Sequence, residues 1–331
     1  MGRNIGIDIL RMLAAFFVVC QHITDYPWNE IIRPQSRIAV PVFFIISGYF
    51  LYDKDGDKVN RRIIKSFKHV LWIFLWATSL YAMYGIFENY PDGNFDFLKI
   101  GSWKLFVFIV SCSPLNFPYG FHLWFLIGLL EGFAILFLMK MLKMLNILNG
   151  GGKITPVLLL IAVLGVVVRQ MFPGMLIPFH GLCFMVMPSL LLGYSLNRQI
   201  SSKPAKHGQC VMLFLLIVCM AMTFMEAWAW GNYEMSPYMM TFLTSPMIFL
   251  LFLQTKYNSC KLVEFIARLG KDCSLGVYII HPIVINMLCK SFGETSWVVQ
   301  PWNVFVISTI VVYVYNLCKS KILSKKTCFI N

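Results

Sequence analysis

Ten apolar segments, each about as long as a membrane-spanning helix, follow one another along the chain. They cover residues 5–24, 36–53, 66–88, 122–139, 154–172, 180–197, 209–230, 236–255, 273–291 and 301–318. A helix needs about 20 mostly apolar residues to cross a bilayer. The pattern predicts an all-α, polytopic membrane protein with about ten transmembrane helices, in a single domain over residues 1–331. A further stretch, 94–112, carries lysines, and we expect it to be interfacial or re-entrant, with a spanning helix as the alternative.

The composition supports a membrane protein and excludes a soluble domain. Of the 331 residues, 58% are hydrophobic, and the mean hydropathy is +0.70. The ten cysteines form no C-x-x-C pair, so we expect neither disulfides nor a metal site. The first apolar run contains Asp8 and Arg11 and lacks a small-residue cleavage site. We therefore expect it to remain as the first span rather than to be removed as a signal peptide.

The distribution of basic residues predicts the orientation of the chain. The net charge is +13, and 21 of the 28 lysines and arginines lie at the two termini or after spans 2, 4, 6 and 8. Basic loops remain on the cytoplasmic side of a membrane. The asymmetry therefore predicts that both termini are cytoplasmic, and it explains the charge without nucleic-acid binding.

The first span carries ionisable residues on one helical face. Arg11 and His22 are eleven residues apart, so in a helix they point within about 20° of each other and lie about 16 Å apart along the axis. Ionisable groups inside a span usually face a cavity or the bundle interior, and histidine can act as a general base or nucleophile. Asp8 could simply pair with Arg11, and Asp25 could orient the His22 ring or be an ordinary loop carboxylate.

The segment that joins spans 2 and 3 is rich in charge. Arg61, Arg62 and Lys65 lie at the beginning of span 3, where they could form a basic rim that binds phosphates. The alternative is ordinary topology-determining charge, because every inner loop is basic.

Spans 2 and 4 contribute three candidates that would line a pore or contact an acceptor. In span 2, Gly48 permits close helix packing, and Tyr49 follows it. Span 4 begins near His122, which could be an interfacial residue, and it carries Glu131 at mid-membrane depth. A carboxylate at that depth needs a partner or a wet cavity.

Span 9 carries a polar stripe. Ser274, Tyr278 and His281 are spaced at i, i+4 and i+7, which places them on one helical face. Pro282 leaves one backbone carbonyl without its helical donor and could bend the helix. The stripe could line the acceptor path or be a satisfied polar packing seam.

These segments together resemble the acyltransferase-3 family of integral membrane acyltransferases. Residues 6–22 resemble the family's R-x10-H signature, and residues 43–49, 122–125 and 274–281 resemble three further landmarks in the family's order. The resemblance implies about ten helices in a bacterial inner membrane. It also implies transfer of an acyl group, usually acetyl from cytoplasmic acetyl-CoA, to an extracytoplasmic sugar or lipid-linked glycan.

The resemblance assigns roles to particular residues. It implies that His22 is catalytic and that Arg11 supports the donor; Arg61, Arg62 and Lys65 match a basic family pattern only loosely. The chain resembles the standalone enzymes that O-acetylate O-antigens, exopolysaccharides and enterobacterial common antigen. Its expected partners are acetyl-CoA, the glycan acceptor and membrane lipids, with no bound cofactor and no nucleic acid.

The residue pattern agrees with this function but leaves alternatives open. Acetyl-CoA would bind with its phosphates at the inner basic rim, its long arm beside Arg11 and its thioester near His22. This arrangement would bring a cytosolic donor to an outer acceptor. His22 could deprotonate the acceptor or carry the acyl group itself, and Tyr278 or Ser274 could donate to the oxyanion. The main rival is a transporter or flippase. A sensory or uptake domain, as in relatives attached to racemases, is a third interpretation.

Overall fold

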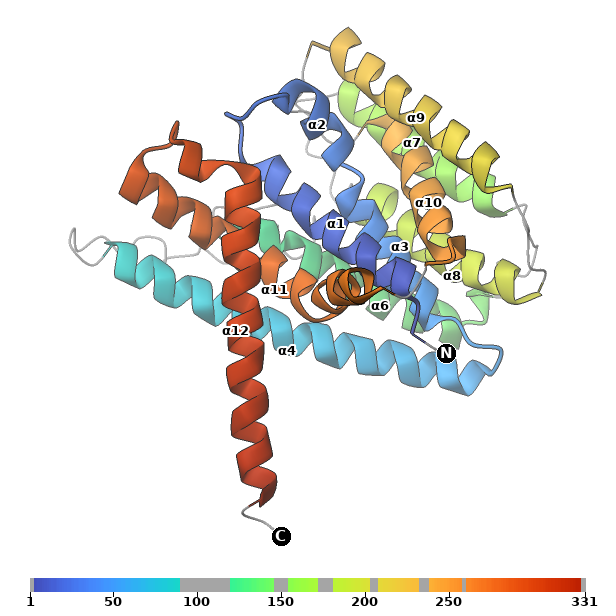
Figure 1. Ribbon diagram of the computed structural model, residues 1–331. Helices are drawn as coiled ribbons and strands as arrows, with labels where there is room; N and C mark the ends of the chain where they lie inside the picture. Colours follow the sequence, from blue (N-terminus) through green and yellow to red (C-terminus); the bar gives the residue numbers. More distant parts are fainter. Residues whose placement is uncertain are drawn as a thin grey trace. The chain divides into compact units, whose positions relative to one another are not determined.

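A computed structural model describes the chain over residues 3–89, 120–145, 154–171, 181–202, 208–231, 238–257 and 260–328. Every regular element within these ranges is a helix (Figure 1). The predicted all-α class is therefore confirmed. The stretch 94–112 lies outside the described residues.

Each of the ten predicted segments overlaps a described helix. The helices are α1 (Ile5–His22), α3 (Ala39–Leu51), α4 (Gly56–Asn89), α6 (Trp124–Met141), α7 (Ile154–Met171), α8 (Met187–Ser202) with the preceding π-helical turn η4 (Leu182–Val186), α9 (Gln209–Ala229), α10 (Met239–Gln254), α11 (Lys261–Phe292) and α12 (Pro301–Cys328). Seven described helices, α1, α4, α6, α7, α9, α11 and α12, are long and apolar enough to cross a membrane. The other three are shorter, with 13 residues in α3 and 16 each in α8 and α10.

Three predicted boundaries were wrong, because α4 and α11 begin earlier and α12 ends later, at Cys328 rather than 318, and one helix was missed. Helix α4 begins at Gly56 rather than near 66, because Asp55 caps it: the Asp57 N–H donates to the Asp55 carboxylate at 2.9 Å. Helix α11 begins at Lys261 rather than near 273, since its first turns mix charged and apolar residues and fall below a spanning hydropathy. The short helix α2 (Asn29–Ser36) lies in a segment that was expected to be a loop.

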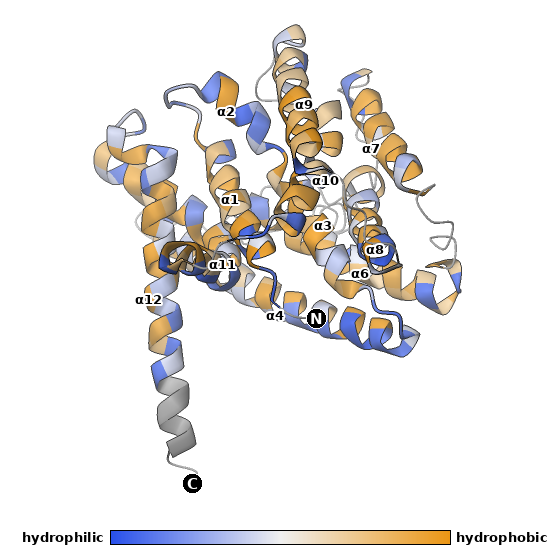
Figure 2. Cartoon of the chain, turned by 45° about the vertical axis from the view of Figure 1, so that its right-hand side comes forward, coloured by the Kyte–Doolittle hydropathy of each residue, from blue (hydrophilic) through white to orange (hydrophobic). Residues whose placement is uncertain are grey.

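Hydrophobic residues predominate along many of these helices (Figure 2), and many large hydrophobic side chains are exposed. Helix α9 is an example, because Val211, Phe214 and Ile217 are exposed by 60%, 64% and 57%. Hydrophilic residues gather instead in the first turns of α4. Soluble monomers rarely expose apolar patches of this extent, so the surface matches a protein surrounded by lipid.

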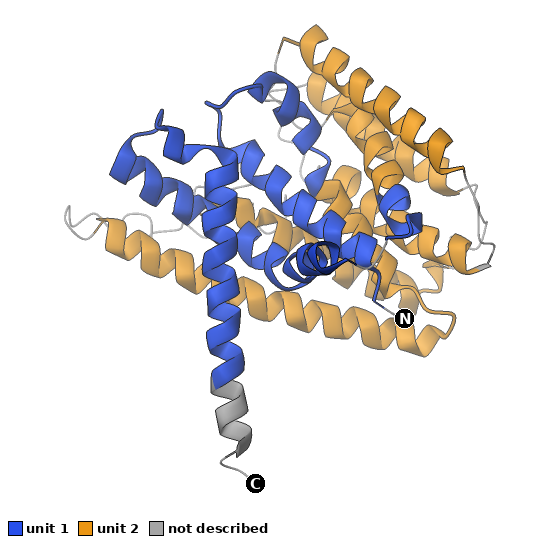
Figure 3. Ribbon diagram, in the orientation of Figure 1, with its two compact units in different colours: residues 1–39, 249–331 blue, residues 40–248 orange. Residues whose placement is uncertain are grey.

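The described chain divides into two compact units (Figure 3). Unit 1 comprises residues 1–39 and 249–331, and therefore combines the two ends of the chain. Unit 2 comprises residues 40–248. Each unit has its own helix packing.

Helices α1 and α11 of unit 1 run parallel in backbone contact. A Cβ atom at Gly270 would lie 1.8 Å from the backbone oxygen of Asp8, so only glycine fits this crossing. Eleven residues further along α11, His281 lies against His22 at the end of α1. The parallel arrangement brings His281, the last residue of the polar stripe of α11, against His22.

Helix α12 packs antiparallel to α11 in the same unit. A Cβ atom at Gly276 would lie 2.5 Å from a methyl group of Val312, and the Asn316 amide donates to the Asp272 carbonyl at 2.9 Å. These contacts hold α11 on its other side.

Unit 2 is organised by a crossing of α3 and α8 at two glycines. A Cβ atom at Gly48 would lie 2.0 Å from the Leu190 carbonyl oxygen, and one at Gly193 would lie 2.0 Å from the Ile45 carbonyl oxygen. The amide of Asn197 on α8 donates to the Tyr49 carbonyl at 2.6 Å. The expectation that Gly48 permits close packing is therefore confirmed.

Candidate active site

The candidate site residues fall into both units. Unit 1 contains Arg11 and His22 on α1 and Ser274, Tyr278 and His281 on α11; unit 2 contains Tyr49 on α3, Arg61, Arg62 and Lys65 on α4, His122 on the 3-10 helix η2 (Phe121–Leu123), and Glu131 on α6. The residues of unit 1 lie on two helices that pack together, α1 and α11.

Arg11 belongs to a three-residue ion cluster in the first turns of α1. The Asp8 carboxylate accepts hydrogen bonds from Arg11 Nη1 at 3.1 Å and from Arg3 Nε at 2.9 Å. The Asp8 side chain is only 6% exposed, whereas those of Arg11 and Arg3 are 26% and 44% exposed. The expected ion pair is present. One buried carboxylate thus orients two cations, and the cluster keeps a net positive charge beside which an anionic donor can bind.

His22 ends α1 and packs against a second histidine. Its ring centroid lies 4.9 Å from that of His281, with the ring planes tilted by 38°. His22 is partly exposed, whereas His281 is fully buried. Imidazoles can bind and release protons near neutral pH, so this end of α1 carries two groups that are suited to acid–base chemistry.

The polar stripe of α11 faces the interior of unit 1. Ser274 and Tyr278 are each 4% exposed, and His281 is 0% exposed. The rings of Tyr278 and His281 lie 6.2 Å apart. The i, i+4, i+7 spacing therefore produces a buried stripe that ends at the histidine pair.

Helix α2 and its end close over the last turn of α1 through residues that the sequence did not single out as functional. The Gln21 amide donates to the Ser36 carbonyl at 2.7 Å, and the Gln21 carbonyl accepts from Arg33 Nη2 at 3.4 Å. Arg37 Nη1 lies 3.5 Å from the Gln21 side-chain oxygen. Two guanidinium groups thus contact Gln21, the residue before His22. They lie at the carbonyl end of α1, where the helix dipole favours positive charge.

Burial raises the pKa of Tyr26, which follows α1 in this region, while the positive charges of Arg33 and Arg37 act in the opposite direction. The hydroxyl of Tyr26 donates to the Cys20 carbonyl at 3.4 Å. Tyr26 therefore acts as a protonated, structural group that anchors the chain after His22.

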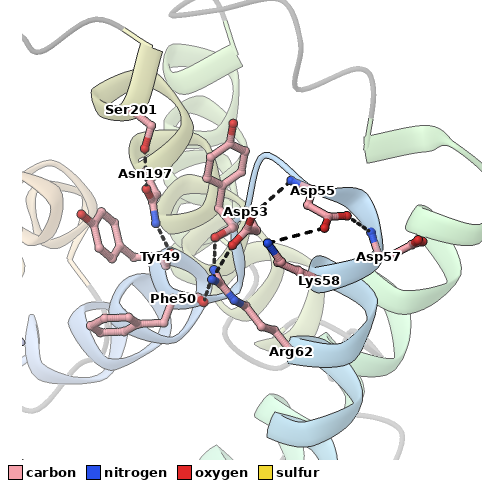
Figure 4. A network of polar contacts seen from close by, with 10 residues as sticks. Tyr49, Phe50, Asp53, Asp55, Asp57, Lys58, Arg62, Asn197 and Ser201 are labelled. Carbon is pink, nitrogen blue, oxygen red and sulfur yellow. Dashed lines mark hydrogen bonds and ion pairs between the residues drawn. The ribbon is translucent and has the colours of Figure 1, made fainter. Parts of the chain in front are cut away.

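In unit 2, Arg62 stabilises the connection between α3 and α4 (Figure 4). Its guanidinium donates to the carbonyls of Phe50 and Tyr52 and to the Asp53 carboxylate. Carbonyls at the end of a helix lack intrahelical donors, and the guanidinium of Arg62 provides the missing hydrogen bonds. Arg62 therefore has a structural role that the basic-rim interpretation did not foresee.

Asp53 is the anionic centre of this network. Its carboxylate accepts the Asp55 N–H at 3.1 Å and pairs with Arg62. The Asp55 N–H, the charge of Arg62 and other nearby donors hold the pKa of Asp53 below its ordinary value. The Arg62–Asp53 pair thus remains charged at neutral pH.

Arg61 and Lys65 lie on α4 itself, not in a loop before it. Both side chains are exposed, and they are four residues apart on the helix. That spacing places them on one face, where two cations can contact the same anion.

The remaining candidates of unit 2 occupy different elements. Tyr49 is 5% exposed, and its ring packs edge-on against Phe50 at 5.5 Å. His122 is 1% exposed, and its ring contacts that of Tyr81 at 5.1 Å. Glu131 is partly exposed on α6. The roles assigned to these three residues remain predictions.

Sequence reasoning missed the contacts that link distant residues. The pairing of His22 with His281 joins positions 259 residues apart, and no local pattern indicates it. The role of Arg62 depends on the chain reversing between α3 and α4. The early start of α4 was readable, because Asp55 followed by Gly56 and Asp57 is a helix N-cap signal.

The described residues form helices, and seven of these are long and apolar enough to cross a membrane, so the chain is a multi-pass membrane protein. The family model described as an acyltransferase domain, that of the acyltransferase-3 family, matches residues 4–317. The chain therefore belongs to the acyltransferase-3 family, and the resemblance read from its motifs is confirmed.

The chain is also similar to part of a serine/alanine racemase from Enterococcus gallinarum. The two are 29% identical over 144 residues, which make up 40% of this chain and 19% of the racemase. The chain thus spans about a fifth of the length of that curated relative. No solved structure matches the chain.

Proposed function

We propose that this protein is a membrane O-acyltransferase that moves an acetyl group from cytoplasmic acetyl-CoA to a hydroxyl of a surface or lipid-linked glycan. The observation that carries the proposal is the arrangement of α1. The charged cluster of Arg11 lies about 16 Å along the helix from His22, which ends the helix against His281.

The chemistry needs one base and a donor thioester. The acceptor hydroxyl attacks the acyl carbon and its proton passes to His22; the carbon–sulfur bond then breaks, and the CoA thiolate takes that proton. In the alternative route, His22 attacks first and carries the acyl group before the acceptor arrives. Both routes use His22 and consume one acetyl-CoA for each ester formed.

The charges favour a donor that approaches the beginning of α1. CoA carries several phosphates on a long, narrow arm, and guanidinium groups are good phosphate ligands. Arg11 and Arg3 keep a net positive charge around Asp8. Within unit 2, Arg61 and Lys65 on α4 remain the proposed phosphate ligands, because Arg62 is engaged with Asp53.

A transporter or flippase explains intramembrane charges equally well in principle. Such proteins often bind substrate at broken helices. Helix α1 runs continuously past its charged residues, and α11 continues through Pro282. The family membership and the histidine pair at a helix end favour group transfer.

The similarity to a racemase that acts on serine and alanine supports a second candidate. A domain that binds or imports a small amino acid would also need a membrane span with charged residues. The match covers 40% of this chain, whereas the acyltransferase family model covers residues 4–317. Acyl transfer is therefore the stronger proposal.

Sided membrane vesicles test the proposal. Sealed vesicles of one orientation that contain the glycan acceptor receive radiolabelled acetyl-CoA, which does not cross membranes. We expect label to enter glycan only when acetyl-CoA contacts the face that carries Lys319 and Lys321 at the end of α12. Transfer from the opposite face alone would contradict the topology. Uptake of labelled serine or alanine without acetyl transfer would favour the second candidate.

Matched variants on α4 test the donor contacts. Replacing Arg61 and Lys65 with alanine should weaken acetyl-CoA binding in calorimetry without lowering thermal stability. Lys58, which pairs with Asp55 at 3.6 Å, provides the control: Lys58→Ala should leave donor affinity unchanged. Equal donor affinity in the double variant and the wild type would reduce Arg61 and Lys65 to topology-determining charges.

A further inference from the structure

Pro282 and His281 on α11 together determine the hydrogen bonding of one backbone carbonyl. Proline has no N–H, so the carbonyl four residues earlier, that of Tyr278, loses its helical donor. His281 Nδ1 lies 2.8 Å from that Tyr278 carbonyl oxygen and 3.2 Å from the carbonyl oxygen of Val277. The histidine side chain therefore replaces the donor that the proline removes.

These contacts define the protonation pattern of the His281 ring. A carbonyl oxygen can only accept a hydrogen bond, so Nδ1 must carry the proton. In a neutral imidazole, Nε2 is then the acceptor. The side chain is 0% exposed, so the neutral form is favoured over a buried cation.

The ring that is fixed in this way lies against the end of α1. The His281 and His22 centroids are 4.9 Å apart. The backbone contact at Gly270 fixes the spacing of the two parallel helices, and helix α12 packs on α11 at Gly276. The backbone crossing at Gly270 and the two carbonyl contacts of Nδ1 thus hold His281 beside His22.

We infer that His281 is a positioning residue for His22: its Nδ1–H is locked on the Tyr278 carbonyl, and its Nε2 accepts a hydrogen bond from His22 when His22 carries the acceptor's proton. This role rests on the proposed acyl transfer. The acceptor O–H proton moves to His22 and then to the CoA thiolate, while His281 neither gains nor loses a proton. A neutral imidazole thus takes the orienting role that a carboxylate fills in other triads.

Nuclear magnetic resonance tests the lock without any substrate. The 15N chemical shifts of the full chain, labelled with 15N-histidine in lipid nanodiscs, show whether each ring nitrogen is protonated. The chain has six histidines, and the signal of His281 is the one that disappears in His281→Gln. We expect Nδ1 protonated and Nε2 unprotonated at neutral pH. A protonated Nε2 would overturn the inference.

Replacement of the proline tests the cause of the lock. Pro282→Ala restores a backbone donor to the Tyr278 carbonyl, so the His281 signal should change to a mixture of tautomers. Pro246 lies inside α10, and Pro246→Ala should leave the signal unchanged. A single Nδ1-protonated tautomer in Pro282→Ala would show that the proline does not set it.

Two substitutions of His281 test the catalytic consequence. A glutamine side chain places a polar atom near the Nε2 position, whereas asparagine reaches only the Nδ1 position. We expect His281→Asn to lower kcat for CoA release from acetyl-CoA by about 100-fold with KM unchanged, and His281→Gln to recover about tenfold of that loss. Equal losses in two folded variants would refute a role for Nε2.

The two proposals fail in distinguishable ways. If wild-type protein releases no CoA from acetyl-CoA, the proposed acyl transfer fails, while the resonance measurements still decide whether His281 is locked. If wild-type protein turns over acetyl-CoA but His281→Asn retains full kcat, the positioning role fails and the proposed function stands.

Discussion

Gly270→Ala should disturb the candidate site from a distance. A Cβ atom at this position would lie 1.8 Å from the Asp8 backbone oxygen, and ordinary contact begins at 3.4 Å. The two backbones cannot yield locally, so α11 must move from α1 by roughly 1.5 Å. Overpacking of this kind costs about 1–3 kcal/mol of stability, and a misplacement of about 1 Å can cost about 100-fold in rate.

The assay combines stability with turnover. Thermal unfolding in detergent should show a lower Tm, and CoA release from acetyl-CoA in vesicles should fall by about 100-fold. Gly276→Ala is the matched control on the same helix, because the atoms nearest to its Cβ belong to the Val312 side chain on α12 and not to the backbone of α1. Gly270→Ala with wild-type Tm and turnover would refute the view that this crossing fixes the histidine pair.

Three further predictions concern single residues. His22→Ala should abolish acetyl transfer to glycan while membrane expression stays near normal; persistent transfer in cells would remove His22 from the chemistry. Arg11→Lys should lose activity if the forked guanidinium matters, whereas full turnover would leave Arg11 as a charge only. The pKa of Asp53 is lowered in the folded protein. The contribution of Asp53 to stability should therefore be complete above the ordinary aspartate pKa of about 4, and it should be lost as the pH falls below that value. Tm measured from pH 7 to 3 should show this loss in wild type and not in Asp53→Asn.

The sequence predicted the helices well because a membrane span is a local property. Each apolar segment overlaps a described helix. The spacing of Ser274, Tyr278 and His281 predicted one shared face, and the structure adds that all three are buried. The errors at the beginning of α4 and α11 arose where amphipathic turns extend a span beyond its apolar part.

The candidate site was only partly readable. The Arg11–Asp8 pair is three residues apart and therefore visible in sequence. The contact of His22 with His281 depends on how α1 and α11 pair. The ion pair of Arg62 with Asp53 depends on the reversal of the chain between α3 and α4. Periodicity reports which face a residue occupies, but not which distant residue it meets.

The composition of unit 1 from both ends of the chain has a consequence for biosynthesis. Helix α1 is made first, but its partner α11 follows more than 200 residues later. At about 5–20 residues per second, the wait is roughly 10 to 50 seconds. During that interval the charges of α1 must be tolerated in lipid without α11. Arg3 and Arg11 pair with Asp8 within a single segment, so the newly made helix carries its own neutralising partners into the membrane. The contact of His22 with His281 can form only after the ribosome has passed residue 281.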